Sequence, residues 1–302
     1  MAGYTVIDLE TTGLSPRKSD RVVEIGVVYV SHRGQVQGSW STLVNPQRDV
    51  GPTSIHGITA SEVIHAPTFA QIAPLVLESI AGRTVVAHNA RFDVGFLDAE
   101  LRRAGVPLGE EPIPAVCTME WARTFVASRS RSLGDVCAAC GVDLVNAHSA
   151  VGDALATAGL LAHYLERSRF SPPWWDTVQR ARAFPWPVHK GGRPQVALAG
   201  RAPRAHGRAP EPTALAPSFT LTPGDRVAFT GEMRRTRQEW EAAAQRAGLV
   251  VDSVTRNTRV LVAADVNTRS RKAERARWNG VPIITEADFV RLLSRGVGVR
   301  SR

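Results

Sequence analysis

The chain has 302 residues, of which 43% are hydrophobic and 22% charged, so disorder throughout is excluded and two compact domains are expected. No apolar run reaches the roughly eighteen residues of a membrane span, and the start of the sequence lacks the pattern of a secretion signal. We therefore expect a cytoplasmic protein with no membrane partner. The three cysteines are too few for a disulfide framework and fit a reducing compartment.

The net charge of +9 is concentrated in the later part of the chain. Residues 1–168 carry 13 basic and 17 acidic side chains, residues 169–218 carry 8 and 2, and residues 219–302 carry 16 and 9. Basic surface attracts polyphosphates, so this distribution favours a nucleic-acid partner. The alternative is that the arginine excess partly reflects genome composition, because very few of the cations are lysines.

Strand-like and helix-like runs alternate between residues 4 and 166. Runs of β-branched and apolar residues predict strands at 4–9, 22–30, 40–44 and 84–87. Helical spacing and glycine stop signals predict helices at 68–80, 91–104, 133–140 and 150–166. This order predicts an α/β domain over residues 1–168, with a mixed sheet and helices around it.

Residues 169–218 are rich in proline, glycine and arginine, and nine of the nineteen prolines lie between residues 171 and 217. Such a composition buries too little apolar area to offset the entropy of ordering, so it predicts a linker. Its first part, residues 172–187, contains more aromatic residues than a spacer requires. Two interpretations stay open for that part: it packs on the first domain, or it binds a partner.

A second series of elements follows the linker. Strands are predicted at 226–229, 250–254, 260–262 and 282–284, and helices at 236–247, 270–279 and 286–293. Residues 219–302 are enough for a small, independent α/β module.

Four carboxylates with one histidine beside them stand out in the first domain. Asp8 and Glu10 lie on the same face of a strand, where they repel each other unless cations lie between them. Asp93 lies in the first turn of a helix, where a capping role is the alternative. His148 comes just before another helix and Asp153 about one turn inside it, so both can point at one spot.

Carboxylate oxygens are ligands for Mg²⁺ or Mn²⁺, and four negative charges balance two divalent ions. Two such ions about 3.5–4 Å apart can support in-line attack on phosphorus, and a histidine can accept the proton of the attacking water. The residues therefore predict a phosphodiester hydrolase.

The segments Asp8-x-Glu10-Thr-Thr-Gly, His88-Asn-Ala-x-Phe-Asp93 and His148-x4-Asp153 resemble the three motifs of the DnaQ-like exonuclease family, in the DEDDh form. The resemblance spans about residues 4–166. It implies an RNase H-like fold and two-metal 3′–5′ exonuclease activity. It also implies that the four acidic residues are metal ligands and that His148 is the general base.

The same resemblance implies substrate contacts. Thr11, Thr12 and Leu14 are expected to approach the terminal nucleotide, and Phe92 to lie beside it. Residues 55–59 resemble a loop in the proofreading subunits of bacterial DNA polymerase III, where His56 or Ile58 would wedge against the terminal base or sugar. A turn at Gly57 is the alternative explanation of this loop.

A zinc site at Cys137-Ala-Ala-Cys140 is the weaker interpretation, because no second Cys or His pair has ligand spacing nearby. Small buried residues on a helix are the preferred explanation of these cysteines.

Residues 222–295 resemble a BRCT domain, through Phe229-Thr-Gly231, Ala247-Gly248 and Gly280-Val-Pro-Ile-Ile284 among other segments. A Thr hydroxyl and a Gly amide at a strand-to-loop junction can bind a phosphate. The resemblance implies such contacts at Thr230 and Gly231, with cations from Arg237 and from Arg275 or Lys272. The alternative is a module that contacts only proteins.

Together these features predict a metal-dependent 3′–5′ exonuclease that releases nucleoside 5′-monophosphates from DNA in repair or end trimming. Its partners would be DNA 3′ ends, 5′-phosphorylated duplex ends or proteins recognised by the BRCT module, and a polymerase or repair protein. Three alternatives remain: a proofreading subunit bound to a DNA polymerase, an RNA 3′ exonuclease, and a non-catalytic binding protein.

Overall fold

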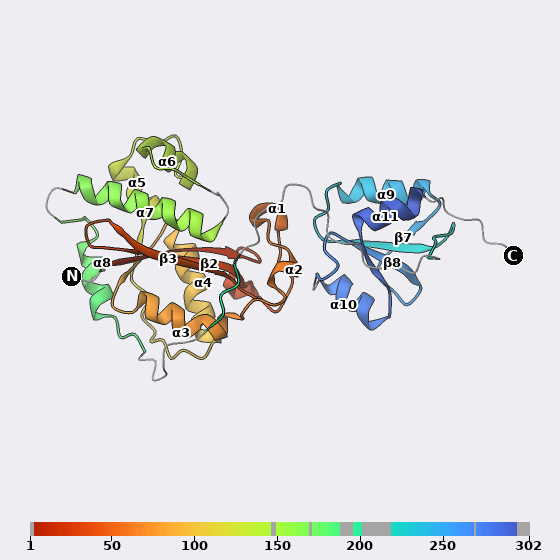
Figure 1. Ribbon diagram of the computed structural model, residues 1–302, viewed down its shortest axis with the longest axis horizontal. Coiled ribbons are helices and arrows are strands. Elements are labelled where there is room, and N and C mark those ends of the chain that lie inside the picture. Colours follow the sequence, from red (N-terminus) through yellow and green to blue (C-terminus); the bar gives the residue numbers. More distant parts are fainter. Residues whose placement is uncertain are drawn as a thin grey trace. The chain divides into compact units, whose positions relative to one another are not determined.

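The computed structural model describes residues 3–145, 149–168, 171–187, 196–200, 219–268 and 270–294. The chain forms two compact units (Figure 1). The first comprises Met1–Gln47, Ile55–Gly57 and His65–Arg201, and the second comprises Arg48–Ser54, Ile58–Ile64 and Ala202–Arg302.

The first unit is built on a five-stranded mixed sheet in the order β3-β2-β1-β4-β5. The strands are β1 (Tyr4–Thr11), β2 (Val22–Val30), β3 (Val36–Leu43), β4 (Thr84–Ala87) and β5 (Ala115–Cys117). β1, β2 and β3 pair antiparallel, whereas β4 and β5 continue the sheet in parallel. The mixed α/β architecture expected from the sequence is thus confirmed, although the three-residue β5 was not predicted.

Helices cover both faces of this sheet (Figure 1). The helices that cover it are α3 (Phe69–Ile80), α4 (Ala90–Arg103), α5 (Thr118–Phe125), α6 (Leu133–Cys140), α7 (Ala150–Arg167) and α8 (Trp175–Ala183). Three shorter helices also occur: η1 (Pro16–Lys18), α1 (Thr53–His56), whose residues are divided between the two units, and α2 (Ala60–Val63), which belongs to the second unit. α3 and α4 pack with Ile7 and Leu9 of β1 on one face. α5, α6, α7 and α8 pack with Tyr4 and Val6 on the other. Because side chains alternate along a strand, Asp8 and Glu10 lie on the face that α7 covers.

The tryptophan-rich start of the predicted linker packs on the first unit. Trp174 is 2% exposed, and its indole N–H donates to the Tyr4 hydroxyl at 3.3 Å. Val178 and Ala181 of α8 are also buried. Of the two interpretations left open by the sequence, the structure therefore favours packing on the domain.

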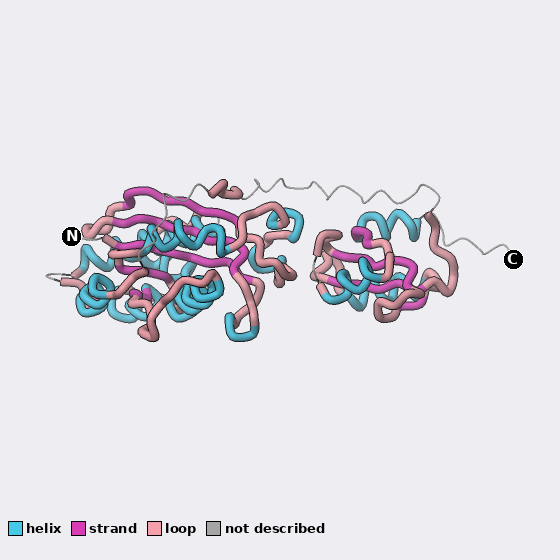
Figure 2. The backbone as a smooth tube through the Cα atoms, turned by 90° about the horizontal axis from the view of Figure 1, so that it is seen from below, coloured by secondary structure: helices cyan, strands magenta, loops and turns pink. Residues whose placement is uncertain are grey.

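The second unit contains a four-stranded parallel sheet in the order β7-β6-β8-β9. Its strands are β6 (Arg226–Thr230), β7 (Val250–Val251), β8 (Thr258–Ala263) and β9 (Ile283–Thr285), and its helices are α9 (Arg237–Arg246), α10 (Arg271–Trp278) and α11 (Glu286–Ser294). Residues of α9 and α11 share one apolar cluster with the sheet, and residues of α10 share another. Figure 2 shows the strands of each unit running together, with helices beside them. None of the described helices is long and apolar enough to span a bilayer.

Candidate metal centre

The candidate metal centre lies where β1 meets the start of α7. Asp8 and Glu10 come from β1, and Asp153 comes from the first turn of α7. One carboxylate oxygen from each of these three residues lies within 4.8 Å of the other two. The structure thus brings together three of the four predicted ligands from segments far apart in the chain.

Asp93 reaches the same region from the first turn of α4. Its side chain is buried, and Oδ1 accepts a hydrogen bond from the backbone N–H of Leu9 at 3.2 Å. Leu9 lies between Asp8 and Glu10 on β1, so this bond holds Asp93 beside the other carboxylates.

Two of the acidic residues, Asp8 and Asp93, have raised pKa values. Burial is the main reason that the pKa of Asp8 lies well above its usual value, and repulsion from Asp93, Asp153 and Glu10 adds to it. Burial also raises the pKa of Asp93 to about 7. A divalent cation would relieve this repulsion, and carboxylate oxygens suit Mg²⁺ or Mn²⁺. The donor set therefore fits a divalent cation.

Glu24 is a further acidic residue at this centre that the sequence analysis did not select. It is buried on β2 directly opposite Glu10, and it contributes to the raised pKa of Asp8. Its Oε2 accepts a hydrogen bond from the backbone N–H of Ala150, the first residue of α7, at 3.2 Å. The sequence did contain a signal that could have identified Glu24, because it is the one carboxylate in the otherwise apolar run 22–30.

Gly26 explains how α7 comes so close to the sheet. It pairs with Asp8, and a Cβ at this position would lie 2.3 Å from the carbonyl carbon and oxygen of Ala150. Any larger residue would therefore push the start of α7 away from β2.

The predicted general base, His148, lies outside the described residues, as do residues 146 and 147. Its role remains a prediction. The described part of the chain resumes at Ser149, next to the first residue of α7.

His88 of the second motif has a local structural role. It is mostly buried, with Nε2 2.9 Å from the Arg131 carbonyl and Nδ1 3.0 Å from the Thr118 hydroxyl. A carbonyl only accepts, so Nε2 carries the proton and Nδ1 accepts from Thr118. Burial lowers the pKa of His88, which favours this neutral form.

A pocket of about 680 Å³ lies between the loop after β1 and α4. Leu14 and Phe92, two of the predicted substrate contacts, both line it, and Leu14 is 85% exposed. Thr11 and Thr12 are buried before this loop and do not line the pocket. His56, at the end of α1, and Ile58 are buried and are also not among its lining residues.

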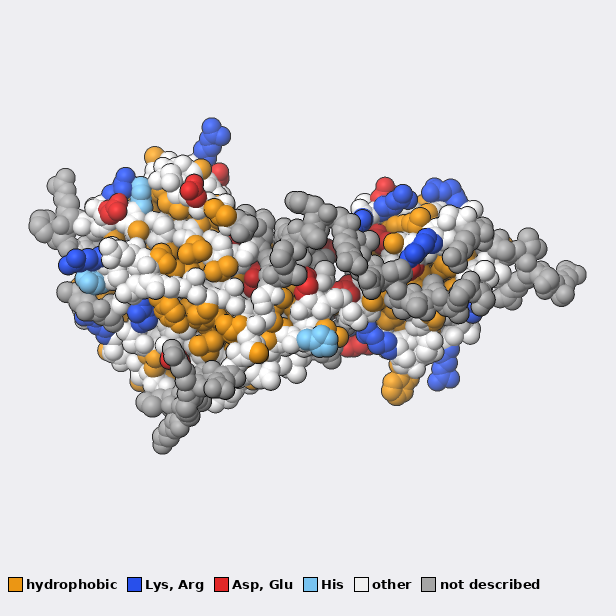
Figure 3. All heavy atoms as spheres, in the orientation of Figure 1, with side chains coloured by type: hydrophobic (Ala, Val, Ile, Leu, Met, Phe, Trp, Pro, Cys, Tyr) orange, Lys and Arg blue, Asp and Glu red, His pale blue; other side chains and the backbone are white. Residues whose placement is uncertain are grey.

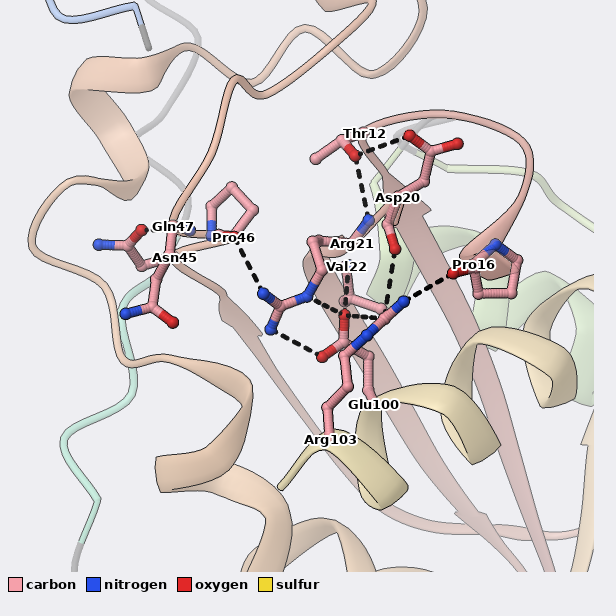
Figure 4. A network of polar contacts seen from close by, with 10 residues as sticks. All are labelled: Thr12, Pro16, Asp20, Arg21, Val22, Asn45, Pro46, Gln47, Glu100 and Arg103. Carbon is pink, nitrogen blue, oxygen red and sulfur yellow. Dashed lines mark hydrogen bonds and ion pairs between the residues drawn. The ribbon is translucent and has the colours of Figure 1, made fainter. Parts of the chain in front are cut away.

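A network of polar contacts holds the loop after β1 against α4 (Figure 4). Glu100, which is 1% exposed, accepts from Arg21 Nε at 2.6 Å and from Arg21 Nη2 at 2.9 Å. Arg103 also donates to Glu100 and reaches the Pro16 carbonyl at 2.6 Å. The ion pair thus fixes the segment that carries Leu14.

In the second unit, most of the predicted phosphate contacts surround the end of β6. Thr230 is buried, with its hydroxyl 2.9 Å from that of Ser270, and Gly231 has a positive φ of 84°. Lys272 donates to the Phe229 carbonyl at 3.0 Å. Burial lowers the pKa of Lys272, and the positive charge of Arg237 lowers it further. Arg237 therefore lies close enough to Lys272 for their charges to repel each other. Arg275 instead lines a groove along α10, which Lys272 also borders.

Cys137 and Cys140 do not belong to a metal-ligand cluster among the described residues. Cys137 is buried, and burial raises its pKa to about 11. The environment of Cys137 agrees with the preferred interpretation of small buried residues on a helix, whereas Cys140 is only partly buried.

A family model described as "Exonuclease" matches residues 5–161. The chain belongs to this exonuclease family. The matched range contains Asp8, Glu10, Asp93 and Asp153, together with the mixed sheet that positions them.

Two relatives illustrate the similarity. A DNA polymerase III of the PolC type from Clostridium perfringens is 37% identical over 161 residues, covering 52% of this chain and 11% of the relative. The DNA polymerase III subunit epsilon of Pasteurella multocida is 31% identical over 164 residues, covering 52% of this chain and 64% of the relative. The chain thus spans less than two thirds of either relative.

Among solved structures, a complex of Escherichia coli ExoI with single-stranded DNA matches with a TM-score of 0.50 and 19% identity, covering 58% of this chain and 42% of that one. This likeness shows that the first unit has the RNase H-like exonuclease fold.

Proposed function

We propose that the first unit is a two-metal 3′–5′ exonuclease that removes nucleoside 5′-monophosphates from DNA ends. The observation that carries this proposal is the convergence of Asp8, Glu10 and Asp153 within 4.8 Å, with Asp93 held beside them by the Leu9 N–H. Burial raises the pKa of Asp8 and Asp93, and neighbouring carboxylates raise that of Asp8 further, so a cationic partner is needed to keep both groups ionised at neutral pH.

The four acidic residues would hold two Mg²⁺ or Mn²⁺ ions. Such ions supply a nucleophile at neutral pH and stabilise the charge that develops on the scissile phosphate. His148, just before α7, would accept the proton of the attacking water. Glu24 and Gly26 would position Asp153 by fixing the start of α7 against β2.

The terminal nucleotide would occupy the pocket between Leu14 and Phe92. The exposed Leu14 offers an apolar contact to a base, and the Phe92 ring can pack beside it. Thr11 and Thr12 would approach from the end of β1. His56 and Ile58 are the less favoured contacts, since both are buried away from the pocket lining.

The second unit would act as a BRCT-like module that binds 5′-phosphorylated DNA ends or protein partners, joined by the proline- and arginine-rich linker. Its small α/β fold and the placement of Thr230, Gly231 and Lys272 at the end of β6 support this role. We propose DNA repair or end trimming as the process.

A proofreading role beside a polymerase is the second candidate. It is favoured by the relatives named DNA polymerase III PolC-type and subunit epsilon. Stable co-purification with a polymerase would favour this candidate over an independent repair enzyme.

The deciding assay follows hydrolysis of 3′- and 5′-labelled DNA and RNA oligonucleotides by the full chain with Mg²⁺, Mn²⁺ or EDTA. We expect stepwise loss from the 3′ end of DNA, no activity in EDTA, and a loss of about a thousandfold or more in Asp8→Ala. Glu111→Gln, at an exposed site, is the control. An inactive wild type, or Asp8→Ala within threefold of it, would overturn the proposal, and faster RNA hydrolysis would assign RNA as substrate.

The module is tested separately with short duplexes bearing a 5′-phosphate or a 5′-hydroxyl, in EDTA. Arg237→Ala should remove the preference for the phosphate without changing hydrolysis of short single strands. Equal affinity of the wild type for both duplexes would favour a module for protein contacts.

A further inference from the structure

The most exposed large apolar side chain of the second unit, among its described residues, is Trp278 at the end of α10, with 87% of its surface accessible. α10 packs on the sheet through Ala273 and Ala276, which are fully buried. Trp278 follows Ala276 by two positions, so it lies on the opposite side of the helix. It therefore does not contribute to the core, and its indole is accessible to a ligand.

Cations line the groove that contains this indole. Arg271, Arg275 and Trp278 are spaced i, i+4 and i+7 and so share one helix face. They line a groove of about 850 Å³ together with Lys272 and, opposite α10, Ser253 and Val254. Among the residues that the structure describes, neither Arg271 nor Arg275 forms a salt bridge. Glu274 is the one acidic residue lining this groove.

We propose that this groove binds an internal stretch of single-stranded nucleic acid, with a base stacked on Trp278 and neighbouring phosphates on Arg271 and Arg275. A flat aromatic face beside arginines matches the alternating base and phosphate of one strand. Bases inside a duplex are already stacked on each other and cannot reach the indole. The charge of residues 219–302, with 16 basic against 9 acidic side chains, supports a polyanionic occupant over an acidic peptide.

This contact differs from the one proposed around Thr230 and Arg237, because it needs no terminal phosphate. It is also independent of hydrolysis at the carboxylates of the first unit. Its consequence is that the second unit would retain a strand after each cut, since a tethered second contact raises the local concentration of substrate.

The test uses the full chain in EDTA and a fluorescent circular oligothymidylate, which has neither a 3′ end nor a 5′ phosphate. Binding is followed by fluorescence anisotropy at several salt concentrations. Since stacking contributes about 1–3 kcal/mol per base, Trp278→Ala should weaken binding by roughly 5- to 150-fold, and Trp278→Phe should retain most of the affinity. Arg271→Ala and Arg275→Ala should each reduce the salt slope by about 0.7.

Trp175→Ala is the matched control. Trp175 is also exposed, but it belongs to α8 of the first unit, and the Arg182 guanidinium lies 5.7 Å from its ring centroid. This variant should bind the circle like the wild type. The wild type should bind a circle of abasic sugar-phosphate less tightly than the thymidylate circle. Trp278→Ala should bind the two circles with equal affinity.

Two results would overturn the inference. One is an unchanged affinity of Trp278→Ala for the thymidylate circle. The other is equal affinity of the wild type for the thymidylate and abasic circles, which would mean that charge alone attracts the strand. Loss of 3′ hydrolysis in Asp8→Ala with circle binding retained would separate this site from the exonuclease centre.

Discussion

The Glu24 carboxylate accepts a hydrogen bond from the backbone N–H of Ala150 at 3.2 Å, across 126 positions of sequence. This bond ties β2 to the first residue of α7, and Asp153 lies one turn further along the same helix. The start of a helix has N–H groups without intrahelical partners, so a buried carboxylate there anchors it. Glu24 thereby sets the position of Asp153 without itself being one of the predicted metal ligands.

Glu24→Ala should lower kcat/KM by about 10- to 100-fold and raise the Mg²⁺ concentration needed for half-maximal activity. Removal of the acceptor lets the start of α7 move, and Asp153 moves with it. Glu24→Gln keeps an acceptor oxygen and should be closer to the wild type. Metal titrations of activity distinguish this effect from simple destabilisation, and an unchanged Mg²⁺ requirement in both variants would contradict it.

Gly26→Ala should impair the same centre through a steric route. Its Cβ would lie 2.3 Å from the Ala150 carbonyl, so backbone must shift. We expect a loss of about 1–3 kcal/mol in the free energy of unfolding, together with reduced hydrolysis. Gly38→Ala on β3 is the control, because its nearest neighbour would be a Tyr29 ring carbon at 3.8 Å. Equal urea midpoints for the two variants would refute the explanation.

The metal-free protein should become less stable as the pH rises from about 4 to about 7. The pKa of Asp93 is raised to about 7 in the fold from an ordinary value near 4, so between these values the folded state binds more protons than the unfolded state. The free energy of unfolding therefore falls from about pH 4 to about pH 7, and a divalent ion should restore it.

Asp93→Asn should reduce this effect, while the raised pKa of Asp8 leaves part of it in place. In EDTA at pH 8 its melting temperature should exceed that of the wild type by a few degrees, the shift that a gain of about 1 kcal/mol in the free energy of unfolding produces. Hydrolysis should be lost in this variant. Asp98→Asn, on the exposed side of the same helix, should leave the melting temperature unchanged. Thermal denaturation with and without Mg²⁺ checks both, and a lower melting temperature of Asp93→Asn in EDTA at pH 8 would contradict an unfavourable burial of the ionised Asp93 carboxylate.

Glu100→Ala should destabilise the first unit and loosen the loop that carries Leu14. It removes the acceptor for both Arg21 nitrogens and for Arg103. Because the Arg21 side chain is 20% exposed, we expect a cost of about 2–3 kcal/mol, below that of a fully buried pair. Asp98→Asn breaks the more exposed pair with Arg102 and should leave the free energy of unfolding nearly unchanged, because solvent screens that pair. Chemical denaturation measures the free energy of unfolding of both variants. Similar losses in Glu100→Ala and Asp98→Asn would contradict a stabilising role of the Glu100 ion pairs.

Local patterns in the sequence predicted most of the regular elements. The strand at 22–30, the strand at 84–87 and the helix at 133–140 have the bounds expected from β-branched runs, helical spacing and the stop at Gly141. β5 and α5 escaped prediction because β5 has only three residues and α5 follows it without a separating turn. Packing on Tyr4 and its neighbours decided that residues 174–183 join the first unit, and no local pattern specifies such a partner.

By itself, the sequence determined which side chains are chemically suited to the site. The alternation of Asp8 and Glu10 on one strand, and the place of Asp93 and Asp153 in the first turns of two helices, follow from local periodicity. Only the tertiary structure decided that Glu24 faces Glu10 and anchors Ala150, and that Gly26 makes room for α7. The physical reason is that strand register and helix docking depend on contacts between residues far apart in the chain, whereas periodicity acts between neighbours.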